Sequence, residues 1–366
     1  MKLIFSILIL FTITLPTRSQ DAYSFFIAGH VYGEPGVNNP GLHPPFINKF
    51  PYIQSRPEIQ FGVFTGDIVS TNPSSQDWDE VDADISDLGL PVYFAVGNHD
   101  MENRPLYESR YGATYYSFTH ENDLFIVLDP NLDSWNISGE QLTFFQNTIN
   151  TNAASVNNIF ILFHQLIWLD NSRYSDIIPN SKEGKASSIN FWTEIEPLCH
   201  QLDNNVFFLA GDIGAGAWCN DFMFDSYDNI TLIASGMGEQ DGDNFVILNI
   251  DTDKSVSYDL ICLDTPNLEC FGEIEDYDLH YSVKTLASNT KMRIFPNPSS
   301  DYIIIENSNS INEVSFQLFN TIGRNIFTTK TFPSQKINIG NLAKGIYFYK
   351  IQTDTEYNTG KLIIIK

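Results

Sequence analysis

The 366-residue chain has few basic residues: 20 Lys and Arg stand against 45 Asp and Glu, which gives a formal net charge of −25 at pH 7. This shortage argues against a nucleic-acid-binding protein, because binding to a phosphate backbone depends on clustered Lys and Arg. No apolar run after residue 20 reaches the roughly 18–20 residues that a membrane-spanning helix needs. Apolar residues are nevertheless plentiful, at 43%, so an intrinsically disordered acidic chain is also excluded.

Cysteine is scarce as well, with four residues in the whole chain. None of them belongs to a Cys-x-x-Cys motif or a Cys/His cluster, so the sequence offers no zinc or dithiol redox site. An even number of cysteines in an exported protein suggests disulfide bonds. Their spacing favours the pairs Cys199–Cys219 and Cys262–Cys270, and free buried thiols are the alternative.

The first 20 residues have the pattern of a secretory signal peptide. Lys2 precedes an apolar run from Leu3 to Leu15, and a short polar stretch ends at Gln20. The run is too short to span a membrane, and no stop-transfer pattern follows it. We therefore expect residues 1–20 to direct export of the chain and to be removed.

The net negative charge belongs to the first part of the chain. Residues 284–366 hold ten Lys and Arg against five Asp and Glu, so this segment carries +5 and residues 1–283 carry −30. A change of sign at one boundary indicates two separate units. We assign residues 21–277 to a first domain, 278–291 to a linker and 292–366 to a second domain.

The first 260 residues alternate apolar runs with amphipathic segments, which predicts a layered α/β domain. The expected strands are Ser24–Ala28, Gln60–Thr65, Val92–Val96, Asp123–Leu128, Ile159–Phe163, Val206–Ala210, Thr231–Ser235 and Asn244–Ile250. The expected helices are 75–88, 138–150 and 190–202. From about residue 290, short apolar runs between Gly, Pro, Asn and Ser predict a small β-sandwich of roughly 75–80 residues.

Polar residues follow five of the expected strands. In chain order they are His30, Asp67, Asn98-His99-Asp100, His164 and Asp212. Ligands of open α/β sheets bind outside the carboxyl ends of the strands, so these residues are expected to form one metal or catalytic site. Taken singly, a Gly-Asp pair is often only a turn and a lone histidine is often a buried core residue. The ordered set therefore supports the site better than any single member.

Three of these blocks, Gly66-Asp67, Gly97-Asn98-His99-Asp100 and His164, resemble the calcineurin-like metallophosphoesterase superfamily. The resemblance covers roughly residues 22–262. It implies a four-layer α/β/β/α fold, two metal ions bridged by the aspartate of the Gly-Asp block, and hydrolysis of phosphate esters.

The chain departs from the family pattern at two metal-binding positions. Ala28 stands where the family has its first aspartate, and Gly211-Asp212-Ile213-Gly214 stands where the family has Gly-His-x-His. One of the two ions of the family thereby loses two of its three ligands, those at the positions of Ala28 and Gly214. The resemblance therefore implies one main ion, doubtfully a second, with Mn²⁺, Mg²⁺ or Fe²⁺ preferred to Zn²⁺ because its ligands are mostly oxygens. The implied ligands are Asp67, Asn98, His164 and Asp212, with Glu34, Asp241 or Asp243 as alternative ligands of a second ion.

The same resemblance implies how such a site would work. His99 would be the general acid, with Asp100 orienting its ring, and His30 would act as a hydrogen-bond donor at the vacated ion position. This gives a metal-dependent hydrolase of phosphomonoesters or phosphodiesters. The alternative is a degenerate metal-binding surface module without turnover.

Two segments near these residues are candidates for substrate contact. Residues 31–45 are rich in Gly, Pro and Asn and are expected to wall the site, and residues 164–190 form a long connection that is a candidate lid. Trp168, Arg173 and Tyr174 could contact a ligand there, and packing in the core is the alternative. Since few Lys or Arg lie near the motifs, a multiply phosphorylated substrate is disfavoured.

The C-terminal segment contains Phe295-Pro296-Asn297-Pro298, then Gly323, then residues 344–351, and ends in residues 360–366. These ordered blocks resemble the type A sorting domain of the type IX secretion system. The resemblance implies export by that machinery across both membranes of a Gram-negative bacterium, to the cell surface or the medium.

Overall fold

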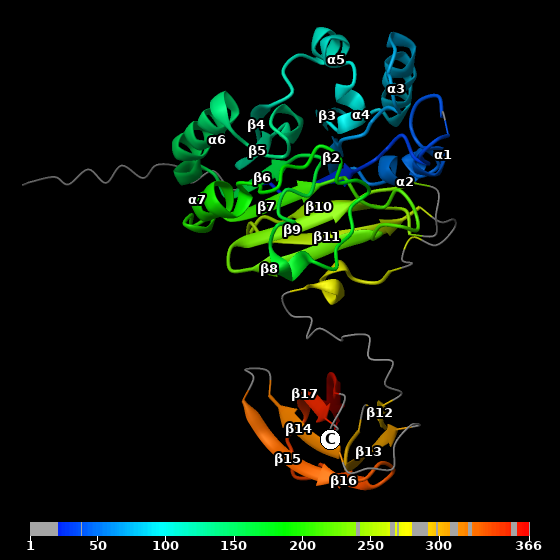
Figure 1. Cartoon of the computed structure of the whole chain (residues 1–366), viewed down its shortest axis with the longest axis vertical. Helices are drawn as coiled ribbons and strands as arrows, with labels where there is room; N and C mark the ends of the chain where they lie inside the picture. The colour runs from blue at the N-terminus through cyan, green and yellow to red at the C-terminus, as the bar shows by residue number, and fades with distance from the viewer. Residues whose placement is uncertain are drawn as a thin grey trace, which may run out of the picture. The chain divides into compact units, whose positions relative to one another are not determined.

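The structure is a computed structural model. It describes residues 21–37, 39–238, 242–263, 268, 271–279, 292–297, 299–307, 314–320, 324–352 and 357–365. The chain divides after Tyr277 into two compact units, which are described separately (Figure 1). The predicted signal peptide and most of the predicted linker lie outside the described residues.

The first unit contains a five-stranded sheet. Its order is β11 (Val256–Cys262), β10 (Asn244–Ile250), β1 (Tyr23–Ala28), β2 (Ile59–Thr65) and β3 (Val92–Ala95). The last three strands are parallel, whereas β10 and β11 pair antiparallel. All six residues of β1 are buried. Strands buried on both faces show no polar alternation, which is why β1 and its neighbours stand out as apolar runs in the sequence.

A six-stranded sheet lies against the first. Its order is β4 (Tyr116–His120), β5 (Asp123–Val127), β6 (Asn158–Leu162), β7 (Asn205–Ala210), β9 (Ile230–Ser235) and β8 (Phe222–Tyr227). The four central strands are parallel, and the two edge strands are antiparallel. The polar segments after β5, β6, β7 and β9 therefore leave the sheet on the same side.

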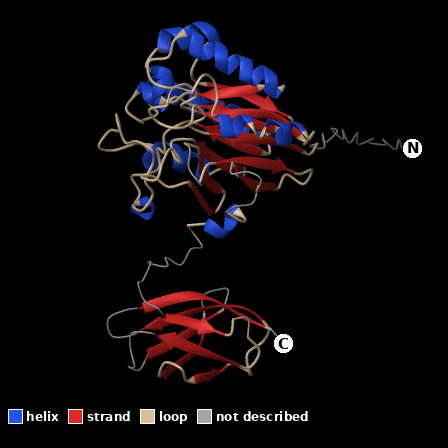
Figure 2. Cartoon of the chain, turned by 90° about the vertical axis from the view of Figure 1, so that its right-hand side faces the viewer, coloured by secondary structure: helices blue, strands red, loops and turns tan. Residues whose placement is uncertain are grey.

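Aromatic side chains join the two sheets face to face. Phe25 of β1 lies 5.2 Å from Phe125 of β5 and 5.0 Å from Phe160 of β6, measured between ring centroids. Helices cover the outer faces (Figures 1 and 2): α1 (Pro44–Ile47), α2 (Phe50–Gln54) and α3 (Ser75–Leu88) lie on one side, and α6 (Gly139–Asn152) and α7 (Glu196–His200) on the other. The predicted four-layer α/β/β/α arrangement is confirmed.

The predicted strands and helices of the first unit are present, with ends that shift by one or two residues, except that the predicted helix 190–202 is a π-helical segment, Phe191–Ile195, followed by α7. Strands β4, β8 and β11 and the short helices α1, α2, α4 (Asn98–Met101) and α5 (Arg104–Tyr111) were not predicted. They are short or carry polar residues, so no apolar period marks them. Among the described residues, no helix has both the length and the apolarity to cross a membrane.

One predicted disulfide is wrong. Cys199 and Cys219 are free. Cys199 is buried in α7, whereas the Cys219 thiol donates to the Gly216 carbonyl in the loop after β7. Proximity in the sequence does not bring these two residues together. Cys262 is disulfide-bonded, as predicted, and its predicted partner Cys270 lies outside the described residues.

The second unit is a small all-β sandwich. One sheet has the order β12 (Met292–Phe295), β13 (Tyr302–Asn307) and β16 (Lys336–Asn338), and the other β15 (Asn325–Thr331), β14 (Val314–Phe319), β17 (Gly345–Gln352) and β18 (Tyr357–Ile364). Buried and half-buried residues alternate along β14, as expected for a strand with one face in the core. The predicted β-sandwich is confirmed.

Candidate functional site

Five strand ends deliver the polar residues that the sequence singled out. His30 follows β1, Asp67 follows β2, His164 follows β6 and Asp212 follows β7. All four are buried and lie in one cluster. Asn98 opens α4 after β3 and is half-buried.

Tight backbone turns bring His30 and Asp67 into this cluster. Both adopt left-handed backbone conformations, with φ of 54° and 49°, and Gly66 has φ of 88°. The His30 N–H donates to the Gly66 carbonyl at 2.9 Å, which ties the ends of β1 and β2. A Cβ on Gly66 would lie 2.5 Å from the His164 ring, so this position needs glycine for both its conformation and its space.

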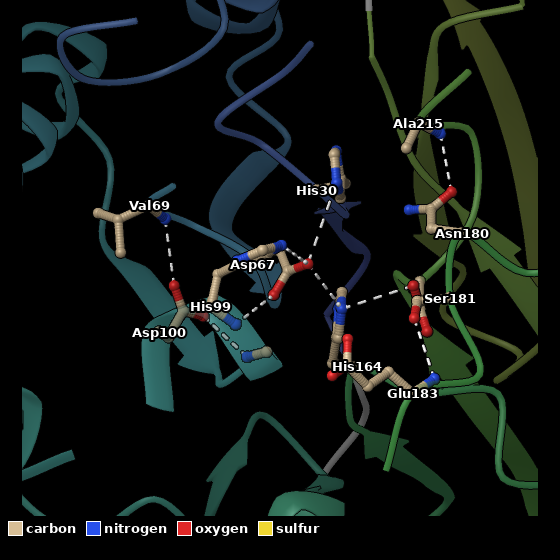
Figure 3. A network of polar contacts seen from close by, with 12 residues as sticks. His30, Asp67, Val69, His99, Asp100, His164, Asn180, Ser181, Glu183 and Ala215 are labelled. Atoms are coloured by element: carbon tan, nitrogen blue, oxygen red, sulfur yellow. Dashed lines mark hydrogen bonds and ion pairs between the residues drawn. The ribbon is translucent and has the colours of Figure 1, made fainter. Parts of the chain in front are cut away.

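The Asp67 carboxylate faces three imidazole rings (Figure 3). Its Oδ2 lies 3.2 Å from His164 Nε2, 3.8 Å from His99 Nε2 and 3.9 Å from His30 Nε2. Its Oδ1 accepts a hydrogen bond from the His99 backbone N–H at 3.1 Å. One negative group is thus surrounded by nitrogens that can carry a proton or bind a cation.

Two of these rings are anchored through their other nitrogen. His164 Nδ1 donates to the Thr65 carbonyl and His30 Nδ1 to the Met237 carbonyl, each at 2.8 Å. The Nδ1 atoms are the donors because a carbonyl oxygen can only accept. Both Nε2 atoms are therefore turned toward Asp67, which is how metal-binding histidines are commonly oriented.

Three buried atoms of the cluster have no hydrogen-bond partner: His99 Nδ1, which lies 3.3 Å from Glu102 Oε1, and the pair His164 Nε2 and Asp212 Oδ2. Buried polar atoms rarely stay unsatisfied, and a cation would satisfy both atoms of this pair. Ligands bonded at roughly 2.1 Å to one octahedral ion lie about 3 Å apart, so the Asp67–His164 contact fits this spacing. Asp212 Oδ1 is 3.8 Å from His164 Nε2 and would have to move inward. As it stands, no group of three or more His, Cys, Asp or Glu among the described residues is arranged to hold a metal ion.

Burial and charge shift the pKa values in the cluster in opposite directions. Burial lowers the pKa of His30 to about 4 and raises the pKa of Asp212 to about 7. Burial would also lower the pKa of His164, but the charges of Asp67 and Asp212 outweigh it and raise this pKa to about 10. Burial would raise the pKa of Asp67, but His164 beside it holds this pKa well below its usual range. Without a cation, Asp67 and His164 therefore form a charged pair.

This pair predicts an unusual pH dependence of stability. The pKa of His164 is higher in the folded chain, about 10, than its ordinary value near 6.5, so the pair's stabilisation is complete below pH 6.5 and is lost toward pH 10. A bound cation competes with the His164 proton and should bind more tightly as the pH rises. In EDTA, we expect Tm to fall by at least about 3 °C between pH 6.5 and 9.5. In Mn²⁺, the gain in Tm over EDTA should grow across the same range.

The measurement is thermal unfolding followed by circular dichroism, with His164→Gln as the matched variant. This variant cannot form the charged pair. Its Tm in EDTA should therefore fall much less between pH 6.5 and 9.5 than that of the wild type. If wild type and His164→Gln show the same fall in EDTA, the charged pair does not account for it.

Two known families match the chain. Residues 30–196 match the calcineurin-like phosphoesterase family, and residues 293–366 match the secretion system C-terminal sorting domain. The chain carries a calcineurin-like phosphoesterase domain and a secretion sorting domain. Among solved structures, TT1561 of Thermus thermophilus is similar, with 10% identity, a TM-score of 0.35, and coverage of 65% of this chain and 98% of that chain. No curated protein sequence matches.

The carboxylate beside Nδ1 of His99 is Glu102, not Asp100 as predicted. Asp100 accepts hydrogen bonds from the backbone N–H groups of Ile68, Val69 and Gly97, at 2.9, 3.1 and 2.7 Å. Glu102 Oε1 lies 3.3 Å from His99 Nδ1. A spacing of three residues places two side chains on one helix face, and this spacing was the available signal in the sequence.

His30 is not the hydrogen-bond donor that the sequence suggested. Because its Nδ1 donates to Met237 and burial lowers its pKa to about 4, its Nε2 carries no proton at pH 7. This atom can therefore accept a hydrogen bond, and it lies 3.9 Å from Asp67 Oδ2.

Two positions of the phosphoesterase domain depart from the family pattern, Ala28 and Gly214. At both, glycines let neighbouring loops pack backbone against backbone. A Cβ on Gly29, next to Ala28, would lie 2.3 Å from the Gly211 Cα, and one on Gly214 would lie 2.6 Å from the Gly236 backbone. Ala28 itself is fully buried. The space that the missing histidine would occupy is therefore filled by the loop at Gly236.

Restoring that histidine should harm the domain. Gly214 has φ of 80°, and Gly214→His adds both a conformational penalty and a collision with backbone. We expect a loss of about 2–4 kcal/mol in the free energy of unfolding and no gain in bound metal. Gly184→His is the matched control, because Gly184 has φ of 72° but nothing within 4 Å of its Cβ position. Urea unfolding compares the two variants, and an equal loss in both would show that crowding at Gly214 has no effect.

The segment after His30 lies partly against the site. The Tyr32 ring contacts the rings of His30 and His99, with centroids 4.3 and 5.4 Å apart. His43 Nε2 lies 3.1 Å from Asp243 Oδ2, and both residues are buried. Asp243, which the sequence offered as a ligand of a second ion, thus holds this segment, and Asp241 lies outside the described residues.

Core packing is confirmed for the aromatics after His164. Trp168 is fully buried, and its indole N–H points to the Met223 sulfur at 3.2 Å. The Tyr174 hydroxyl donates to Asp225 at 2.7 Å. Arg173 Nη1 lies 3.3 Å from the same carboxylate. Trp168 and Tyr174 are therefore core residues, whereas Arg173 is exposed.

Proposed function

We propose that this chain is a secreted phosphoesterase that uses one divalent metal ion. The observation that carries the proposal is that two buried atoms beside Asp67 have no hydrogen-bond partner. They are His164 Nε2, which lies 3.2 Å from Asp67 Oδ2, and Asp212 Oδ2. Asp67, Asn98, His164 and Asp212 would hold the ion. With three oxygen ligands and one nitrogen, Mn²⁺, Mg²⁺ or Fe²⁺ suits the site better than Zn²⁺.

The loops beside Ala28 and Gly214 support one ion rather than two. Ala28 offers no ligand atom, and the Gly236 backbone occupies the space beside Gly214. His30, whose Nε2 is free of a proton, faces this side of Asp67. It could accept a hydrogen bond from a water molecule or a substrate hydroxyl there.

The residues divide the work of ester hydrolysis between them. A bound divalent ion supplies an acidified water and polarises a phosphoryl oxygen. His99 Nε2 lies 3.8 Å from Asp67 Oδ2 and is half-buried, so its ring can reach both the site and solvent. His99 would give a proton to the leaving oxygen, and Glu102 would hold its ring through Nδ1.

Delivery of the enzyme would depend on the second unit. The sorting domain matched at residues 293–366 supports export by the type IX secretion machinery to the cell surface or the medium. Residues 1–20 would serve as the signal peptide.

Metal content and turnover together test the function. We expect about one Mn²⁺ per chain by elemental analysis, and hydrolysis of a phosphomonoester or a phosphodiester that EDTA abolishes and Mn²⁺ restores. Nearly two ions per chain would contradict the single site. Metal binding without turnover across monoesters and diesters would favour the alternative, a metal-binding surface module.

A further inference from the structure

Trp218 is unusually exposed for a tryptophan. It exposes 55% of its surface, more than any other large apolar residue in the described part of the first unit. Tryptophan is normally well buried, so an exposed indole calls for an explanation. The ring is nevertheless held in place: its Nε1 donates to the Asn180 carbonyl at 3.2 Å, and a Cβ added to Gly216 would lie 2.1 Å from a ring atom.

A single peptide group separates this indole from the site. The carbonyl of the peptide bond between Asn180 and Ser181 accepts the Trp218 N–H, and the N–H of the same peptide bond donates to the Asp212 carboxylate. Two hydrogen bonds and one peptide group span about 8 Å. Asn180 and Ser181 flank the cluster beside His164 (Figure 3).

Asn180 also fixes the loop that carries Trp218. Its backbone N–H donates to the Asp212 carbonyl at 3.0 Å, its side-chain oxygen accepts from the Ala215 N–H at 2.8 Å, and its side-chain nitrogen donates to the Ile213 carbonyl at 3.2 Å. The indole is therefore a preorganised surface rather than a side chain free to turn away, and preorganisation favours binding.

We propose that Trp218 is a specificity platform on which a planar, uncharged aromatic ring of the substrate stacks. The proposal rests on the proposed function, in which the phosphate would bind beside the ion held by Asp67 and Asp212. The substrate class is then an aryl or nucleoside phosphoester. An additional anionic group is disfavoured, because acidic residues outnumber basic ones in residues 170–185 and 211–221: Asp170, Asp176, Glu183, Asp212 and Asp221 against Arg173, Lys182 and Lys185.

Two phosphonates separate stacking from phosphate binding, because neither can be hydrolysed. Binding of methylphosphonate and phenylphosphonate to the full chain in Mn²⁺ is measured by calorimetry. Wild type should bind phenylphosphonate about 3–10-fold more tightly than methylphosphonate. Trp218→Ala should bring this ratio to about 1 and leave the Kd for methylphosphonate unchanged, whereas Trp218→Phe should keep most of the ratio. Ile326→Ala, which removes an exposed apolar side chain from the second unit, is the control and should change neither Kd.

The outcomes distinguish the platform from the proposed function. A ratio that Trp218→Ala leaves intact, or an equal loss of affinity for both phosphonates, overturns the platform even if the enzyme is active. A ratio that depends on Trp218 in a protein without turnover supports the platform and contradicts the hydrolase. If neither phosphonate binds, both proposals are overturned.

Discussion

Replacing Asp67 with asparagine is expected to lower kcat/KM toward a phosphodiester by about 10³-fold or more. The substitution keeps the shape of the side chain and removes the only charge that His30, His99 and His164 all face. In the proposed mechanism it also weakens the hold on the ion. The measurement is steady-state hydrolysis of bis(p-nitrophenyl) phosphate in saturating Mn²⁺, together with metal content.

The control for Asp67 is a second buried aspartate. Asp225 is also fully buried, but it lies within β8, where its carboxylate accepts from the Tyr174 hydroxyl. Asp225→Asn should change kcat/KM less than about threefold, because it lies outside the group of residues that face Asp67. If Asp67→Asn keeps more than a tenth of the activity while folded, Asp67 is not at the reacting centre.

Replacing His99 with alanine should produce an effect that depends on the leaving group. A general acid matters most when the departing oxygen is strongly basic, so hydrolysis of an alkyl ester should slow by about 10²–10³-fold. A p-nitrophenolate leaves without help, and its release should slow less than about tenfold. The measurement is kcat for an alkyl and a p-nitrophenyl ester of the same phosphate.

The position of His99 makes this variant a clean test. The side chain is half-buried, and its ring contacts Tyr32 edge-on, so its removal should cost little stability. An equal loss for both esters would mean that His99 does not supply the proton but positions the substrate or the ion. Glu102→Gln is then informative, because loss of the carboxylate 3.3 Å from Nδ1 should slow the alkyl ester more than the p-nitrophenyl ester if Glu102 positions His99 for proton transfer.

The sequence predicted the buried cluster because of a simple geometric rule. Parallel strands end at one edge of a sheet, so Asp67, His164 and Asp212, each just after a strand, had to lie near one another. The four layers were predictable for a related reason, since strands buried on both faces form unbroken apolar runs. The strand ends differ by one or two residues from those expected, which does not move the polar groups off the edge.

Other parts of the site depend on distances that a sequence does not encode. Asp100 follows His99 directly, yet α4 turns its carboxylate back onto the amides of Ile68 and Val69. The role of His30 changed for a similar reason, because the Met237 carbonyl, more than 200 residues away, decides which ring nitrogen carries the proton. Nothing near Trp218 in the sequence indicates that Asn180 links it to Asp212.

The glycine-packed loops have a consequence for how this domain can change over evolutionary time. Once the backbone at Gly236 settled against Gly214, a return of histidine at position 214 required the other loop to move first. The proposed loss of the second ion position would then be effectively irreversible by single mutations, each of which would pass through a destabilised chain. Relatives that retain a histidine at the position of Gly214 should therefore carry a longer or displaced loop at the position of residues 236–238, so that the two features are gained or lost together.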